Sequence, residues 1–125
     1  MPASRLLAAA AIGFAATASA QPVAAPAYTI ALYSYGYQPG TIVLSAGRAV
    51  TLNFVNRAGK GHDFTAPKFF AASHILSGNA GGGEIDVGPG QSRSITLIPT
   101  AGRYAVHCGH PFHKMLGMRG DIVVR

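Results

Sequence analysis

The sequence predicts an all-β domain, either a sandwich or a barrel, of seven to eight short strands with one short helix. Short runs of alternating apolar and polar residues recur along the chain, and Gly, Pro and Asn separate them at close intervals. Sixteen glycines and eight prolines among 125 residues provide the turns, and a hydrophobic content of 49% provides a core. Only 11% of the residues are charged, which excludes a disordered chain and a long charged coiled coil.

The N-terminal residues are expected to be a targeting segment rather than part of this domain. Arg5 precedes an apolar run at 6–16, and the Ala-Ser-Ala sequence ending at Ala20 has the small-x-small pattern of a signal-peptidase site. The run is shorter than the roughly 20 residues of a transmembrane helix, although an uncleaved anchor is the alternative. We therefore predict a periplasmic or secreted protein with a signal peptide at 1–20, a flexible segment at 21–27 and a domain at 28–125.

Seven runs bounded by turn residues are predicted as strands: 28–33, 41–44, 49–55, 84–87, 94–98, 103–108 and 121–124. A turn is expected at 37–40. Only 67–76 has helical character, with Pro67 in its first turn and Gly78 beyond its end. The glycine-rich loop at 79–83 lacks the spacing of a phosphate-binding loop.

Composition excludes several classes of function. A single cysteine, Cys108, rules out an internal disulfide framework and any multi-cysteine zinc or iron–sulfur site. The chain has neither a run of Lys and Arg for nucleic acid nor a Gly-x-Ser-x-Gly elbow for hydrolysis. The formal charge is +6, and +5 without residues 1–20, where nine basic side chains face four acidic ones. This dispersed excess favours an acidic or membrane-surface partner.

Cys108 is the most informative single residue. A lone thiol tends to oxidise or to pair between molecules in an oxidising compartment, so an unpaired one needs a reason, and metal ligation is such a reason. His113 and Met118 each follow five residues after the previous candidate ligand. Thiolate, imidazole and thioether form a donor set that suits copper better than magnesium or calcium. His62, which follows the strand at 49–55 and a turn, can add a second imidazole.

The pattern resembles the cupredoxin family, the small blue-copper proteins of the plastocyanin and azurin type. The resemblance rests on PGTIVLSAGRAVTLNFVN, on GHDF, and on YAVHCGHPFHKMLGMRGDIVV, in which Cys-x4-His-x4-Met is the most specific part. It implies a Greek-key β-sandwich and one copper ion per chain. The implied copper ligands are His62, Cys108, His113 and Met118.

The resemblance also implies a function. We expect an electron carrier that cycles Cu(I)/Cu(II) without turning over a substrate, a monomer and not an integral membrane protein. His113 is expected to serve as the electron port, beneath an apolar patch. The redox partner of the protein is expected to be a cytochrome or a respiratory complex. The apolar shell around the copper site is expected to consist of Pro111, Phe112, Met115 and Leu116.

The remaining polar residues near this pattern have different expected roles. His107 alternates with Cys108 along a strand and should point to the opposite face. His110 is expected to support the site or lie on the surface rather than to coordinate. His74 is expected to face solvent. Asp63 is expected to tie loops together by hydrogen bonds.

The sequence is compatible with two other functions and excludes a third. The chain can instead be a periplasmic protein that stores, delivers or senses copper, because His107, His110 and Met115 add donors near the loop. It can also be an interaction domain that has lost its metal. A multicopper oxidase within one chain is excluded, because Gly109 follows Cys108 and no His-x-His pair occurs.

Overall fold

A computed structural model describes residues 1–4, 7–16, 24–113 and 115–125. Within these residues the chain forms ten strands, one α-helix and one 3₁₀-helix. In chain order they are β1 (Ala27–Tyr33), β2 (Gly36–Gln38), β3 (Thr41–Leu44), β4 (Val50–Asn56), β5 (His62–Thr65), α1 (Pro67–Ala72), β6 (His74–Ser77), η1 (Gly81–Gly83), β7 (Glu84–Val87), β8 (Ser92–Ile98), β9 (Gly102–His107) and β10 (Arg119–Val124).

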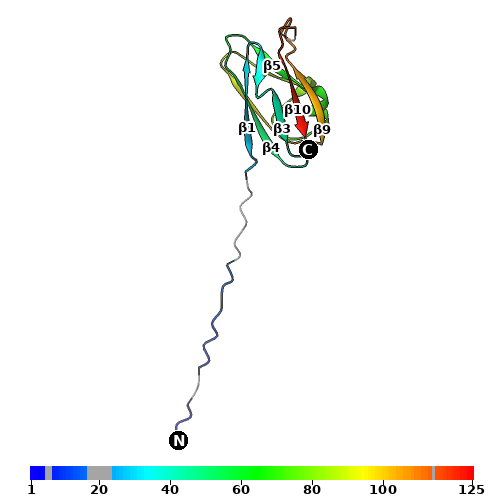
Figure 1. Ribbon diagram of the computed structural model, residues 1–125. Coiled ribbons are helices and arrows are strands. Elements are labelled where there is room, and N and C mark those ends of the chain that lie inside the picture. Colours follow the sequence, from blue (N-terminus) through cyan, green and yellow to red (C-terminus); the bar gives the residue numbers. More distant parts are fainter. Residues whose placement is uncertain (5–6, 17–23, 114) are drawn as a thin grey trace.

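The strands form two five-stranded sheets that pack as a sandwich (Figure 1). The first sheet has the order β2-β1-β4-β8-β6, and the second has the order β3-β10-β9-β5-β7. The pairings β1 with β4 and β3 with β10 are parallel, and the other pairings are antiparallel. The fold-class prediction of a mostly β sandwich with one short helix is therefore confirmed.

Alternation of apolar residues builds the core between the sheets. Along β4, buried Val50, Leu52 and Phe54 alternate with half-buried residues, as a strand with one face on a core requires. Phe54 packs on Phe64 of β5 with ring centroids 4.6 Å apart. Full burial of such a ring contributes about 1.5–3 kcal/mol relative to exposure. His62 and Phe64 share the period of β5, so the packing of Phe64 also fixes the direction in which His62 points.

The seven predicted strands all occur, with ends shifted by at most two residues, but three short strands were not predicted. β2 occupies part of the predicted turn at 37–40, and β5 contains the GHDF segment. The predicted helix at 67–76 is wrong in its second half, because α1 ends at Ala72 and His74–Ser77 pairs with β8. Ile75 is β-branched and suits that pairing. The exposure predicted for His74 is confirmed, although it lies on a strand.

The N-terminal region has no strand or helix in its described part, 1–4, 7–16 and 24–26. Among the described residues no helix is both long enough and apolar enough to span a membrane. The predicted cut after Ala20 and most of the segment 21–27 lie outside the described residues. The chain reaches β1 at the end of the sandwich opposite the β9–β10 connection (Figure 1).

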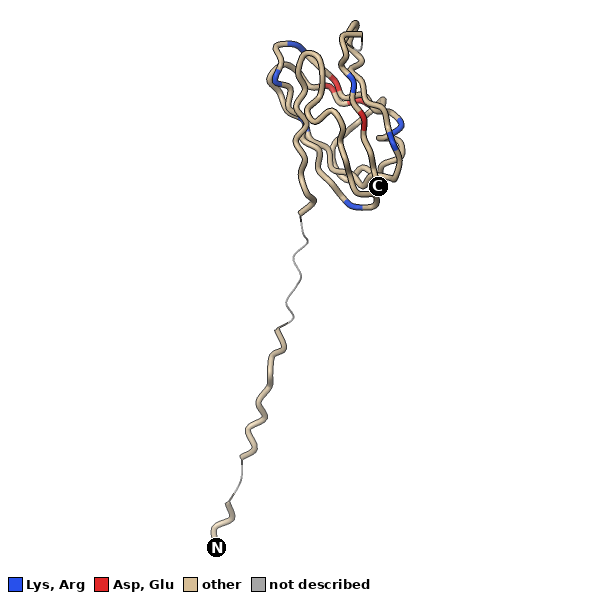
Figure 2. Tube along the Cα trace, viewed as in Figure 1, with Lys and Arg blue, Asp and Glu red and all other residues tan. Residues whose placement is uncertain are grey.

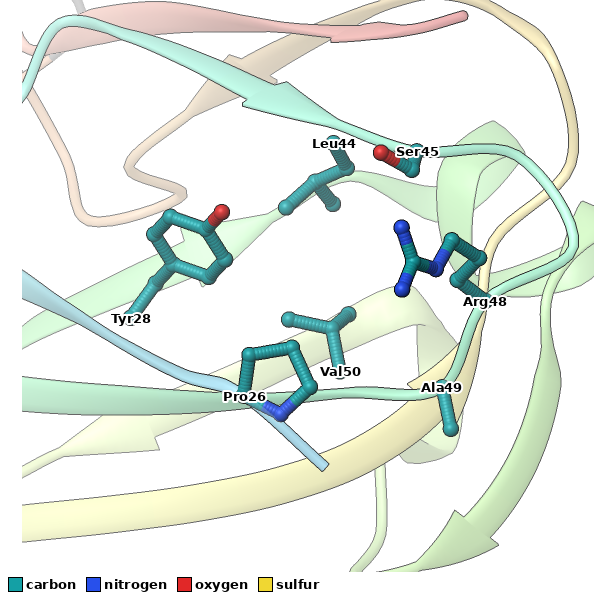
Figure 3. A pocket seen from close by; sticks show the side chains of 7 residues that line it. All are labelled: Pro26, Tyr28, Leu44, Ser45, Arg48, Ala49 and Val50. Atoms are coloured by element: carbon teal, nitrogen blue, oxygen red, sulfur yellow. The ribbon is translucent and has the colours of Figure 1, made fainter. Parts of the chain in front are cut away.

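A small hollow lies where β1 begins, β3 ends and β4 begins (Figure 3). Its lining includes the Tyr28 ring and the Arg48 guanidinium, beside Pro26 and Val50. None of the predicted ligand residues lines it. The hollow is therefore separate from the candidate site, which lies at the other end of the sandwich.

Candidate metal centre

The candidate ligands come from two separate parts of the second sheet. His62 is the first residue of β5, and Cys108 follows directly after β9. The connection from β9 to β10 carries His113 and Met118. The fold brings these segments together because β5 and β9 are neighbours, with Thr65 paired to His107.

Three donor atoms converge at this end of the sandwich. The Cys108 Sγ lies 3.4 Å from His113 Nδ1 and 4.0 Å from His62 Nδ1, and the two nitrogens are 3.1 Å apart. His62 and Cys108 are buried, whereas His113 is half-buried. These residues form a group that can hold one metal ion.

The spacing of the donors matches the size of a first-row metal ion. Two metal–nitrogen bonds of ~2.0 Å and one metal–sulfur bond of ~2.3 Å, spread at about 120°, place the nitrogens roughly 3.5 Å apart and each nitrogen roughly 3.7 Å from the sulfur. The three observed separations, 3.1, 3.4 and 4.0 Å, lie within about half an ångström of these values. The residues present therefore fit a trigonal two-histidine, one-cysteine site.

Met118 is fully buried at the end of the same connection. Its backbone N–H donates to His113 O at 3.0 Å, and its carbonyl accepts from the Cys108 N–H at 3.2 Å. These two hydrogen bonds close the loop around Cys108 and His113. The loop therefore fixes the backbone of three of the four predicted ligands relative to one another.

Outer hydrogen bonds orient the ligands. The Ser34 Oγ lies 3.0 Å from His62 Nε2, the ring nitrogen that faces away from the sulfur. In the tautomer that leaves Nδ1 free for a metal, the Nε2–H donates to this hydroxyl, and such partners fix the orientation of a ligand ring. The Asp63 backbone N–H donates to Cys108 Sγ at 3.5 Å. A backbone donor of this kind stabilises sulfur in its charged form.

Asp63 ties β5 to the ligand loop, as predicted. Its Oδ1 accepts from the Gly109 N–H at 2.7 Å and from the Thr65 hydroxyl at 2.6 Å. The buried Tyr37 hydroxyl donates to the Asp63 carbonyl at 2.6 Å, and its own pKa is raised, chiefly by burial. The side chain of Asp63 is only 4% exposed, so the link is shielded from water.

An aromatic ring covers both histidines. The Tyr35 ring centroid is 5.0 Å from that of His113 and meets that of His62 edge-on at 6.1 Å. Lys60 Nζ donates to the Tyr35 hydroxyl at 3.3 Å. Tyr35 therefore links a surface cation to the two ligand rings.

The protonation equilibria favour neutral imidazoles. Burial, followed by the nearby His113 and His110, lowers the pKa of His62. Burial, followed by His110 and Lys60, lowers the pKa of His113. Burial raises the pKa of the Cys108 thiol, although backbone hydrogen bonds from Asp63 and His110 oppose this. Neutral imidazoles can accept a metal without first losing a proton.

His107 points to the face expected for it, and His110 lies beside a predicted ligand. His107 is half-buried and borders a hollow with Ala105, Pro67 and Lys68, on the face opposite to buried Val106 and Cys108. The His110 ring stacks on that of His113, with centroids 5.3 Å apart and planes inclined by 11°.

Ser34 and Tyr35 are the site residues that the sequence analysis missed. Both lie in the short connection between β1 and β2, and the Ser34–His62 contact spans 28 positions of the chain. The sequence analysis assigned no role to either residue. No spacing pattern marks a hydroxyl that reaches a histidine on another strand.

A family model of the cupredoxin-like domain matches residues 6–124. The chain belongs to the cupredoxin-like family. No curated protein matches this chain. Among solved structures it is similar to a dithionite-reduced auracyanin from Roseiflexus castenholzii, with 20% identity, a TM-score of 0.60, and 82% of this chain and 99% of that chain covered.

Two further solved structures share the fold. Auracyanin A, a "blue" copper protein from Chloroflexus aurantiacus, has 19% identity and a TM-score of 0.59 over 82% of this chain and all of that one. The McoA multicopper oxidase from Aquifex aeolicus has 16% identity and a TM-score of 0.64, over 86% of this chain but 32% of the oxidase. At these identities the similarity establishes the fold of the domain.

Proposed function

We propose that this chain is a periplasmic or secreted copper protein that carries single electrons. His62, Cys108, His113 and Met118 hold one copper ion per chain. The observation that carries the proposal is the convergence of Cys108 Sγ, His62 Nδ1 and His113 Nδ1 within 4.0 Å of one another. Copper bound by these donors would accept and return one electron.

The surroundings of the donors suit this task. β5 and β9 hold His62 and Cys108, Ser34 holds the outer nitrogen of His62, and Asp63 holds the loop. Because these contacts do not depend on the metal, the donors can keep their positions in both oxidation states. Little rearrangement on electron transfer is the condition for a fast carrier.

The surface near His113 suits a protein partner. Phe112, Met115 and Leu116, which are exposed by 71%, 80% and 56%, lie on the same connection as this half-buried ligand. Phe112 has a positive φ of 67°, a conformation that costs a non-glycine residue about 1–2 kcal/mol. An exposed apolar loop beside a ligand is a suitable contact for a cytochrome or a respiratory complex.

Charge favours an acidic partner. All four acidic residues lie on the second sheet, with Asp63 on β5, Glu84 and Asp86 on β7 and Asp121 on β10. The basic residues are spread over both ends and one side of the sandwich (Figure 2). Such an excess attracts an acidic surface through weak, salt-sensitive encounters.

Optical and paramagnetic-resonance spectra of the copper-loaded protein test the proposal. We expect an intense thiolate-to-copper absorption in the oxidised protein, its loss in Cys108→Ser, and reversible one-electron voltammetry. Ser92→Cys, at an exposed position on β8, is the control that adds a thiol outside the predicted ligand set. Colour that survives in Cys108→Ser would eliminate the proposal.

Copper handling is the second candidate function. It is favoured because the His110 ring stacks on that of His113, so that an additional donor lies beside a predicted ligand. A storage or delivery protein would bind Cu(I) preferentially, stay colourless and pass copper quickly to a chelator. Competition between the protein and a Cu(I) chelator distinguishes the two functions. The mass of the exported protein tests the predicted signal peptide, because cleavage after Ala20 leaves Gln21 at the N-terminus.

A further inference from the structure

A second group of metal donors lies beside the first and uses the same sulfur. Asp63, Cys108 and His110 each offer one ligand atom, and these atoms lie within 4.8 Å of one another. His110 Nε2 is 3.6 Å from Asp63 Oδ2. The other carboxylate oxygen, Oδ1, is held by Gly109 and Thr65, so Oδ2 is the one left to face His110.

A like-charge pair stands at the outer side of this group. Asp63 on β5 and Asp86 on β7 are directly opposite each other in the antiparallel register. Two carboxylates in this relation repel each other and destabilise the sheet unless a cation lies near them. His110 Nε2 faces both, at 3.6 Å from Asp63 and 3.9 Å from Asp86.

Exposure to solvent falls from Asp86 through His110 and Asp63 to the buried sulfur. The side chain of Asp86 is 70% exposed, that of His110 is 37% exposed and that of Asp63 is 4% exposed. Cys108 at the inner end is buried. Asp86, His110 and His62 also line one open hollow on this side of the loop.

We propose that Asp63, Cys108 and His110 form a second metal-binding set, through which a divalent cation reaches the Cys108 sulfur before it moves to His62 and His113. One nitrogen, one oxygen and one sulfur donor suit divalent ions such as cobalt and zinc. The sulfur stays bound throughout the transfer, while Asp63 and His110 are exchanged for the two imidazoles. The inference rests on the proposed function only in that both place a metal at Cys108.

Cobalt(II) binding in a His113→Ala background tests the second set. We expect His113→Ala to bind one Co²⁺ per chain with a sulfur-to-cobalt charge-transfer band. Addition of His110→Asn should weaken binding at least tenfold and remove the band, whereas addition of His74→Asn, an exposed histidine on β6, should change neither. An unchanged affinity and band in the His110→Asn double variant would overturn the proposal, as would cobalt binding without any sulfur band.

Copper uptake by the otherwise unaltered chain tests the route. We expect His110→Asn to slow Cu²⁺ loading at least fivefold in stopped-flow measurements, whereas His74→Asn should leave the loading rate unchanged. An unchanged loading rate in His110→Asn would overturn the route, and this measurement stands even if His113→Ala does not fold. Failure of the proposed function would be recognised separately, because the unaltered protein would then lack the copper colour.

Discussion

The carboxylate of Asp63 accepts a hydrogen bond from the Gly109 backbone N–H at 2.7 Å and thereby joins β5 to the loop that carries Cys108, His113 and Met118. The residue that follows one predicted ligand thus holds the residue that follows another. His62 and Cys108 are separated by 46 positions of the chain, and so are Asp63 and Gly109. The hydrogen bond therefore joins the same two segments as the two ligands.

Asp63→Ala should lower the free energy of unfolding of the metal-free protein by about 1–3 kcal/mol, because the Gly109 N–H loses its acceptor. Asp63→Asn retains an acceptor oxygen and should lose less. Denaturant unfolding followed by circular dichroism measures both. An Ala variant as stable as the Asn variant would show that the hydrogen bond contributes nothing to stability.

Ser34→Ala should weaken copper binding by roughly 10–100-fold, because the Nε2 of His62 loses the partner that orients the ring. Ser34→Thr retains a hydroxyl and should recover most of the affinity. Competition with a copper chelator measures the effect. Ser94→Ala, which removes a hydroxyl from the exposed side of β8, is the matched control and should leave the affinity unchanged.

Leu116→Glu should slow electron self-exchange roughly tenfold at low salt, because two copies that meet through this loop would bring like charges together. Leu116 is 56% exposed, and its backbone N–H donates to His113 O at 3.1 Å. Nuclear magnetic resonance line broadening in mixed oxidation states measures the rate. Val43→Glu on β3 adds the same charge at another exposed apolar position and should slow exchange much less. Equal slowing in both variants would refute a role for the loop.

Asp121 should stabilise the fold in a pH-dependent manner. Hydrogen bonds from Thr41 and Arg103 lower its pKa below the ordinary value of 3.8. Because the folded-state pKa is the lower one, the carboxylate contributes stability above the ordinary value, and this contribution is lost as the pH falls through the folded-state pKa. Unfolding free energies at acid pH should therefore fall less steeply for Asp121→Asn than for the unaltered protein.

Local sequence was sufficient for the parts of the fold that a local pattern determines. β3 and β7 have the predicted bounds because alternating apolar residues and flanking turns define them. The predicted helix failed after Ala72 because pairing with β8, which local propensity does not describe, extends His74–Ser77. β2 has only three residues, too few for an alternation to stand out from a turn.

The candidate site divides in the same way. Cys108, His113 and Met118 lie on one connection, so their spacing could be read directly, and His62 could be added because a strand end preceded it. Ser34 and Tyr35 could not be predicted, because their contacts with His62 arise only when the β1–β2 connection folds over β5. The Asp63–Asp86 pairing needs a strand register that the sequence alone did not define.

The place of β10 in its sheet has a consequence for the order of assembly. β10 follows every other strand in the chain, yet it lies between β3 and β9 and pairs with both. β3 therefore has no neighbour in the second sheet until β10 arrives, and the loop before β10 cannot close over its thiol any sooner. A chain that crosses a membrane unfolded would thus keep Cys108 open to oxidants until the final strand has been released on the far side.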